Sequence, residues 1–159
     1  MLGVDPGSHA TGYGVISTGP VVRMLAGGVI RTTSGAPLAD RLLTIHGKLT
    51  EVIAAHDPAA MAVEDLFNAK NPRSSLILGH ARGAILLAGA QAGLPVSEYA
   101  PREVKQALTG NGAAAKEQVR FMVMRLLRLQ DEPPLDMSDA LAVALTHAGR
   151  SGRAGRARG

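Results

Sequence analysis

The acidic residues of this 159-residue chain are spaced so that several of them could act together. Asp5 and Glu64 each end a short apolar run, and Asp136 and Asp139 are three residues apart, so on a helix they would face the same way. Four carboxylates in one place repel one another unless cations are bound. Because hard divalent cations prefer oxygen ligands, the pattern predicts a metal site built from acids.

Each of these acids also has a purely structural interpretation. An aspartate such as Asp136 at a predicted helix start is more often an N-cap than a ligand. Asp5 precedes Pro6 and Gly7 and can be a turn former, and Glu64 can pair with a lysine. Acids that end two strands, together with an i, i+3 acid pair, are a more specific pattern than any one acid alone.

The elements that must position these acids follow from hydropathy spacing and turn residues. A helix that leads into a short strand implies a crossover, which lays the fourth strand parallel to the first and brings Asp5 and Glu64 to one edge of the sheet. The predicted strands are 2–5, 12–17, 22–31, 59–63 and 94–99, of which the first three form an antiparallel meander, and the predicted helices are 38–56, 73–92, 101–108, 113–129 and 136–148.

Composition excludes several classes of protein. The chain is 46% hydrophobic but only 3% aromatic, which predicts one globular domain with an aliphatic core. It has no cysteine, so disulfides, thiolate nucleophiles and cysteine-ligated metals are excluded, and its five histidines lack zinc-site spacing. The most apolar stretch, 84–90, is far shorter than the roughly 20 residues of a membrane span, and no signal segment opens the chain, so we expect a cytoplasmic protein.

The net charge of +4 is unevenly distributed along the chain. Residues 70–128 carry nine basic and three acidic groups, whereas residues 129–149 carry four acids and no lysine or arginine. A basic block beside acids suits a polyanion held next to a carboxylate-bound metal. Residues 150–159 contain four arginines and no acid, and we expect a disordered tail there, after a domain of residues 1–149.

Four blocks of the chain resemble one known family in the same order. They are Leu2-Gly3-Val4-Asp5-Pro6-Gly7-Ser8 with Thr11-Gly12-Tyr13-Gly14-Val15, then Val63-Glu64-Asp65-Leu66-Phe67-Asn68-Ala69-Lys70-Asn71, then Arg102-Glu103-Val104-Lys105-Gln106, and finally Asp136-Met137-Ser138-Asp139-Ala140-Leu141-Ala142. Together they are similar to the RuvC family of Holliday-junction resolvases, from residue 2 to about residue 148.

The resemblance implies an α/β, ribonuclease-H-like fold, a five-stranded mixed sheet flanked by helices, in a homodimer. It implies that Asp5, Glu64, Asp136 and Asp139 are catalytic and coordinate two Mg²⁺ or Mn²⁺ ions. The implied activity is symmetric nicking of two opposing strands of a four-way DNA junction, leaving 5′-phosphate and 3′-hydroxyl ends, in homologous recombination and DNA repair. The implied partners are the RuvA and RuvB branch-migration proteins.

The resemblance also implies which residues contact DNA. Phe67 would probe bases at the junction, and Lys105 and Lys116 would lie close to the scissile phosphate. An aromatic beside a basic loop suits stacking on an unpaired base. The remaining expected DNA contacts are Lys70, Arg73 and Arg120. His9 stands where many relatives have arginine, so a phosphate contact from that turn stays open.

Three other functions fit parts of the sequence. The first turn also resembles the phosphate-binding turn of actin-like ATPases, but 159 residues leave no room for the second domain that those enzymes need. A ribonuclease H acting on RNA/DNA hybrids would share the sheet and the metal ligands, and a noncatalytic junction-binding module would keep the fold alone. The apolar helix 73–92 favours a symmetric dimer, with Leu76, Leu86 and Leu87 in the interface.

Overall fold

A five-stranded mixed sheet forms the centre of the protein, as predicted. The structure is a computed structural model that describes residues 1–65 and 71–156, with side chains described up to Ser151. The first three strands form the predicted antiparallel meander, and the fourth lies parallel to the first. The strands are β1 (Leu2–Asp5), β2 (Ala10–Ser17), β3 (Arg23–Arg31), β4 (Met61–Glu64) and β5 (Val96–Tyr99), in the order β3-β2-β1-β4-β5.

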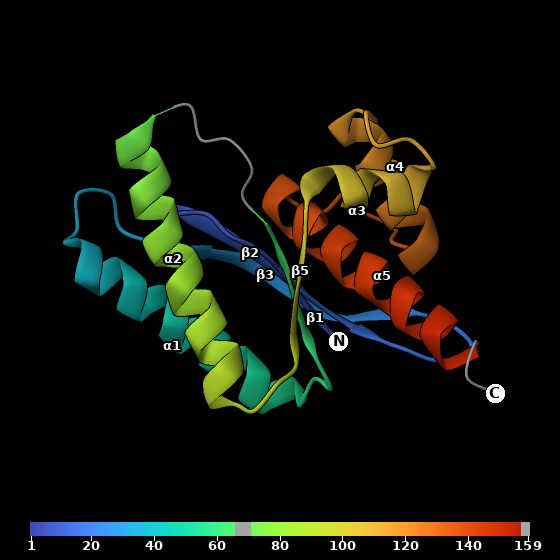
Figure 1. Cartoon of the computed structure of the whole chain (residues 1–159), viewed down its shortest axis with the longest axis horizontal. Coiled ribbons are helices and arrows are strands. Elements are labelled where there is room, and N and C mark those ends of the chain that lie inside the picture. Colours follow the sequence, from blue (N-terminus) through green and yellow to red (C-terminus); the bar gives the residue numbers. More distant parts are fainter. Residues whose placement is uncertain (66–70, 157–159) are drawn as a thin grey trace.

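Helices cover both faces of this sheet (Figure 1). On one face lie α1 (Leu38–His56) and α2 (Pro72–Gln91), and on the other lie α3 (Pro101–Thr109), α4 (Lys116–Leu127) and α5 (Leu135–Arg156). Side chains alternate between the faces along each strand, which gives two cores. Within the described residues, no helix is long and apolar enough to cross a membrane.

The backbone of α5 lies directly against β1 and β2, with no side chain between them. A Cβ added to Gly3 would overlap the Ala140 carbonyl oxygen and lie 2.7 Å from the Ala144 nitrogen. A Cβ added to Gly12 would overlap the carbonyl oxygen of Asp136. Glycine at these two positions therefore lets the helix that carries Asp136 and Asp139 seat on the strand that ends in Asp5.

Helix α5 is longer than the sequence predicts. We predicted an end at Ala148, but the helix continues to Arg156, because Gly149 does not adopt the positive φ of a helix end. Arg150 ties this extension to its neighbours: its Nη2 lies 3.0 Å from Glu103 Oε1, and its guanidinium lies 5.0 Å from the ring centre of Tyr99. The predicted domain boundary at residue 149 falls inside α5, and disorder of residues 150–159 stays a prediction.

Other predicted boundaries differ by a few residues. Helix α4 begins at Lys116 rather than at residue 113, because the Asn111 side chain accepts a hydrogen bond from the Ala113 N–H and holds that segment in a turn. Strands β4 and β5 each begin two residues later than predicted. Strand β1 ends at Asp5 as predicted, and β4 ends at Glu64, one residue later than predicted.

We expect Gly3→Ala to lower the free energy of unfolding by about 1–3 kcal/mol or more, because the methyl group forces α5 off β1. Urea denaturation measures this change. Gly47→Ala is the control: Gly47 lies inside α1 with open space around it, so alanine there should raise stability by about 0.5–1 kcal/mol. Equal stability of Gly3→Ala and the wild type would contradict the close approach.

Candidate active site

Two of the predicted acids lie side by side at one edge of the sheet. Asp5 is the last residue of β1 and Glu64 the last residue of β4, and the parallel register of the two strands pairs Val4 with Val63 just before them. The carboxyl groups of Asp5 and Glu64 share a hydrogen bond. The crossover deduced from the sequence therefore brings this pair together.

Asp139 joins this pair from α5, and burial of the acids shifts their protonation. Burial first, and then the negative charges of Glu64 and Asp139, together raise the pKa of Asp5 to about 8. Burial also raises the pKa of Glu64, and the charge of Asp139 adds to that rise. Near neutral pH, the Asp5–Glu64 pair therefore holds a shared proton when no cation is bound.

Two predicted lysines face these acids. Lys116 Nζ lies 2.9 Å from Asp139 Oδ2, and this hydrogen bond raises the pKa of Lys116. The charges of Lys116 and Lys105 both lower the pKa of Glu64, against the effect of burial. A cavity of about 200 Å³ holds the four polar side chains Glu64, Asp139, Lys105 and Lys116 between apolar walls from α3, α4 and α5.

Asp136, the fourth predicted acid, lies close by without touching the others. Its carbonyl oxygen lies over Gly12, which is the residue paired with Asp5 in the β1–β2 ladder. Its half-buried carboxylate makes no hydrogen bond or ion pair with another residue of the described part of the chain. The start of α5 thus brings Asp136 to the edge of the sheet where β1 ends, with no partner for its carboxylate among the described residues.

The acids fit a hard divalent cation by their chemistry but are not arranged around one. All four offer oxygen donors, and a cation would relieve the like-charge repulsion that raises the pKa of Asp5. In residues 1–65 and 71–151, no three acidic or histidine side chains form a ready ligand group. Lys116 occupies Asp139 Oδ2, so a cation that took this oxygen as a ligand would have to displace the lysine.

The other predicted DNA contacts lie outside this cavity. Arg73 is exposed in the first turn of α2, where its backbone N–H donates to Asn71 Oδ1. Arg120 Nη2 lies 3.4 Å from Glu132 Oε2. Phe67 and Lys70 lie outside the described residues. His9 is exposed in the turn after β1.

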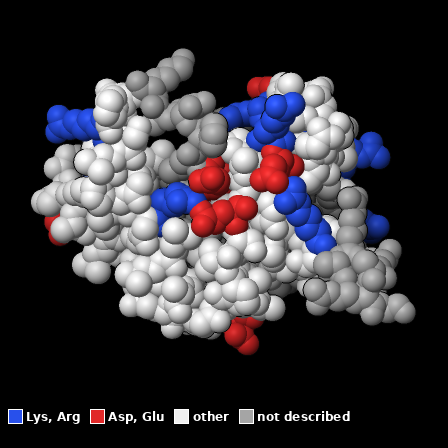
Figure 2. Space-filling model, in the orientation of Figure 1, with Lys and Arg blue, Asp and Glu red and all other residues white. Residues whose placement is uncertain are grey.

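Charged side chains of both signs crowd the face in Figure 2, where acidic groups near the middle have basic groups on either side. The sequence alone did not single out Arg82 of α2. In the structure, Arg82 forms ion pairs with Asp65 and Glu98 at this edge of the sheet. The available signal was an arginine in the middle of a helix whose other arginine, Arg73, lies in the first turn.

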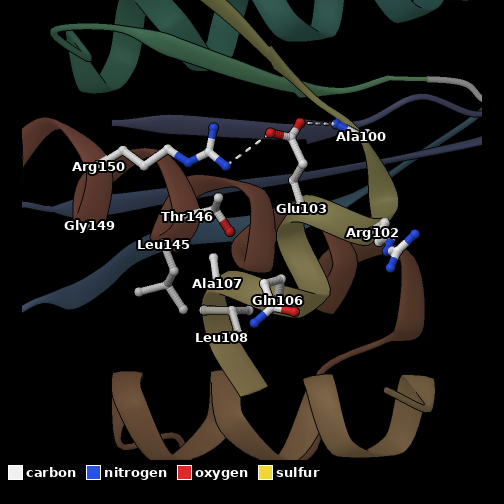
Figure 3. A pocket seen from close by; sticks show the side chains of 10 residues that line it. All are labelled: Ala100, Arg102, Glu103, Gln106, Ala107, Leu108, Leu145, Thr146, Gly149 and Arg150. Carbon is white, nitrogen blue, oxygen red and sulfur yellow. Dashed lines mark hydrogen bonds and ion pairs between the residues drawn. The ribbon is translucent and has the colours of Figure 1, made fainter. Parts of the chain in front are cut away.

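A larger cavity lies between α3 and α5 and has a different character (Figure 3). Its volume is about 620 Å³, and the Arg150–Glu103 ion pair lies along its wall. None of the four predicted acids and neither of the two lysines lines this cavity. The smaller cavity at the ends of β1 and β4 is therefore the candidate active site.

Comparison with known proteins gives the family. The sequence profile of the crossover junction endodeoxyribonuclease RuvC matches residues 1–147. The chain belongs to the RuvC family. RuvC proteins of Stutzerimonas stutzeri and Halorhodospira halophila are 50% and 51% identical to it, over 93% of this chain and over 85% and 89% of their own lengths. The resemblance inferred from the four sequence blocks is thus confirmed, and members of this family are metal-dependent nucleases.

Solved structures agree with this assignment and with the ribonuclease-H-like fold. T. thermophilus RuvC in complex with Holliday junction substrate superposes with a TM-score of 0.89 at 42% identity, covering 95% of this chain and 94% of that one. The yeast mitochondrial Holliday junction resolvase Ydc2 gives a TM-score of 0.62 at 12% identity, covering 92% of this chain and 78% of its own. At that low identity, the likeness to Ydc2 shows a shared fold and nothing more.

Asp5→Asn should raise the stability of the metal-free protein at pH 7–8 by about 1–3 kcal/mol. In the folded protein the pKa of Asp5 is about 8, and in the unfolded chain it is about 3.8. The protonated carboxyl group therefore stabilises the fold fully below pH 3.8, and the protein loses this stability as the pH rises toward 8. Asparagine has no proton to lose and can donate the same hydrogen bond to Glu64. The gain should therefore vanish at pH 4.

Urea unfolding in EDTA at pH 4, 7 and 9 measures this difference. Asp131→Asn, at an exposed position in the loop before α5, is the matched control and should change stability little at any of these pH values. If Asp5→Asn were no more stable than the wild type at pH 7 and 9, the Asp5–Glu64 pair would not be strained by its charges.

Proposed function

We propose that this RuvC-family chain resolves Holliday junctions by metal-dependent hydrolysis of two opposing DNA strands, leaving 5′-phosphate and 3′-hydroxyl ends, in homologous recombination and DNA repair. The observation that carries the proposal is the half-buried cluster of Asp5, Glu64 and Asp139 facing Lys105 and Lys116, in a chain of this family. T. thermophilus RuvC, which superposes closely, is known in complex with a Holliday junction substrate.

The four acids Asp5, Glu64, Asp136 and Asp139 would hold two divalent ions, Mg²⁺ or Mn²⁺. Bound there, such ions supply a water activated for attack and stabilise the leaving 3′ oxygen. The oxygen-only donor set and the like-charge strain of Asp5 support this role. The proton shared by Asp5 and Glu64 leaves when the site is filled, which frees both carboxylates to act as ligands.

The lysines hold the scissile phosphate in the proposed reaction. Lys116 neutralises Asp139 in the free protein, and its side chain is 64% exposed, so it can turn from the carboxylate to a phosphate. Lys105 of α3 lines the same cavity. Two cations on either side of a phosphodiester orient it and offset the charge that develops during displacement. Phe67, Lys70, Arg73 and Arg120 are proposed to contact the arms and bases of the junction.

The chain is proposed to act as a homodimer in the cytoplasm, together with RuvA and RuvB. Symmetric cleavage of a four-way junction needs two active sites related by a two-fold axis. On the outer face of α1 and α2, Leu43, Leu76 and Leu87 are 70%, 63% and 51% exposed beside an apolar hollow of about 450 Å³. Leu86, which we predicted in the interface, packs partly into its own core instead.

The decisive experiment for the function compares a labelled mobile four-way junction, a linear duplex and an RNA/DNA hybrid, each with Mg²⁺, Mn²⁺ or EDTA. We expect paired nicks on opposing strands of the junction only, and none in EDTA. Asp5→Asn should abolish cleavage while junction binding stays intact or tightens, because the change removes a ligand and a negative charge. Cleavage of the hybrid alone would indicate a ribonuclease H, and binding without cleavage would indicate a noncatalytic module.

Leu87→Glu should convert the proposed dimer to a monomer at micromolar concentration, because it places a charge in an apolar contact. Light scattering coupled to size exclusion measures the mass. Leu126→Glu, at a leucine of α4 that is exposed to a similar degree, is the control and should leave the dimer intact. A wild-type monomer, or a dimer that tolerates glutamate at residue 87, would argue against this face.

A further inference from the structure

Glu64 is held by the sheet from one side only. The ladder between β1 and β4 ends at the pair Val4–Val63, one residue before Glu64. On the other side, Glu64 pairs with Tyr99 of β5, and the N–H of Asp65 donates to the Tyr99 carbonyl at 2.7 Å. The position of Glu64 therefore depends on the end of β5, which is an edge strand.

A charged cluster lies directly behind this point, on the face of the sheet covered by α2. Side chains alternate along a strand, so Glu64 and Tyr99 face α5 while Asp65 and Glu98 face the opposite side. Arg82 of α2 reaches both acids: its Nη2 lies 3.1 Å from Asp65 Oδ1 and also forms an ion pair with Glu98. One guanidinium thus bridges the ends of two neighbouring strands.

Arg82 is placed where its charge has a large effect. Its side chain is only 22% exposed, and its Nε is buried with no hydrogen-bond partner among the described residues. Asp65 and Glu98 lie on one face of adjacent strands, where two like charges repel each other if nothing neutralises them. Removing the guanidinium would take away the positive charge that the two strand ends share and would loosen the link that sets the place of Glu64.

We propose that Arg82 is a positioning residue for Glu64. Its ion pairs with Asp65 and Glu98 lock β4 to β5 and so fix the Glu64 carboxylate beside Asp5, from the face of the sheet opposite the cavity. This inference rests on the proposed function, in which Glu64 is a metal ligand. Arg82 does not touch the reacting groups. It acts on the affinity of the site for its cation.

The test is the metal dependence of Arg82→Gln, with Arg82→Lys as the conservative variant. We expect Arg82→Gln to need about tenfold more Mn²⁺ for half-maximal junction cleavage, with the rate recovering at saturating metal. Binding of Mn²⁺ to the free protein, measured by electron paramagnetic resonance, should weaken by a similar factor. Arg82→Lys should recover part of the loss, because lysine keeps the charge but is shorter and lacks the planar guanidinium.

Two further variants keep the result interpretable. Glu98→Gln removes one partner and keeps Arg82, so it should shift the metal dependence in the same direction even if Arg82→Gln folds poorly. Lys48→Gln breaks an exposed ion pair with Glu51 on α1 and should shift nothing. If Arg82→Gln and Glu98→Gln bind Mn²⁺ as the wild type does and lose rate only in proportion to their unfolded fraction, the ion pairs are purely structural and the inference is wrong.

The failure of this inference can be told apart from the failure of the proposed function. Glu64→Gln tests the function itself and should abolish cleavage at every Mn²⁺ concentration. If Glu64→Gln cleaves normally, Glu64 is not a ligand and the proposed function falls. If Glu64→Gln is inactive and the Arg82 variants have unchanged metal affinity, the function stands and the positioning role of Arg82 falls.

Discussion

The close approach of α5 to the first two strands is the constraint on which the active site depends. Gly3 and Gly12 let the helix backbone pack against the strand backbone without a side chain between them. That contact fixes the first turns of α5 at the edge where β1 ends, so Asp139 meets Asp5 and Glu64. Any larger residue at either glycine would move one acid away from the other two.

The gathering of acids has a cost for folding, and the surrounding residues reduce it. Asp5 and Glu64 are largely buried and close to a third carboxylate, so in the metal-free protein the pair keeps a proton at neutral pH. Lys116 offsets part of the charge from the cavity side. Strain of this kind is common where a site must bind a ligand tightly, since the ligand relieves it.

Much of this architecture follows from sequence patterns alone. The turn after Asp5, the meander and the crossover predict the mixed sheet and the Asp5–Glu64 pair, because parallel neighbouring strands end at one edge. Lys105 and Lys116 were predicted from the family resemblance, and both line the cavity. These features can be predicted from sequence because short segments determine the direction of the backbone and the spacing of the side chains that face the core.

What the sequence could not reveal depends on contacts between distant side chains. Gly149 predicts a helix end, yet α5 continues past it. Arg150 in the continuation contacts Glu103 and Tyr99, both about fifty residues away in the sequence. Nothing in the sequence around Arg120 points to its ion pair with Glu132, which lies in the loop after α4. Contacts of this kind can be identified only in the three-dimensional structure.

The most direct test of the account is a calorimetric titration of Mn²⁺ into the metal-free protein at pH 7, in buffers of different ionisation enthalpy, because the dependence of the heat on the buffer counts released protons. We predict that about one proton leaves the wild-type site when the cation replaces it. Mn²⁺ binding to the wild type without proton release would contradict the account of a buried, proton-sharing carboxylate pair.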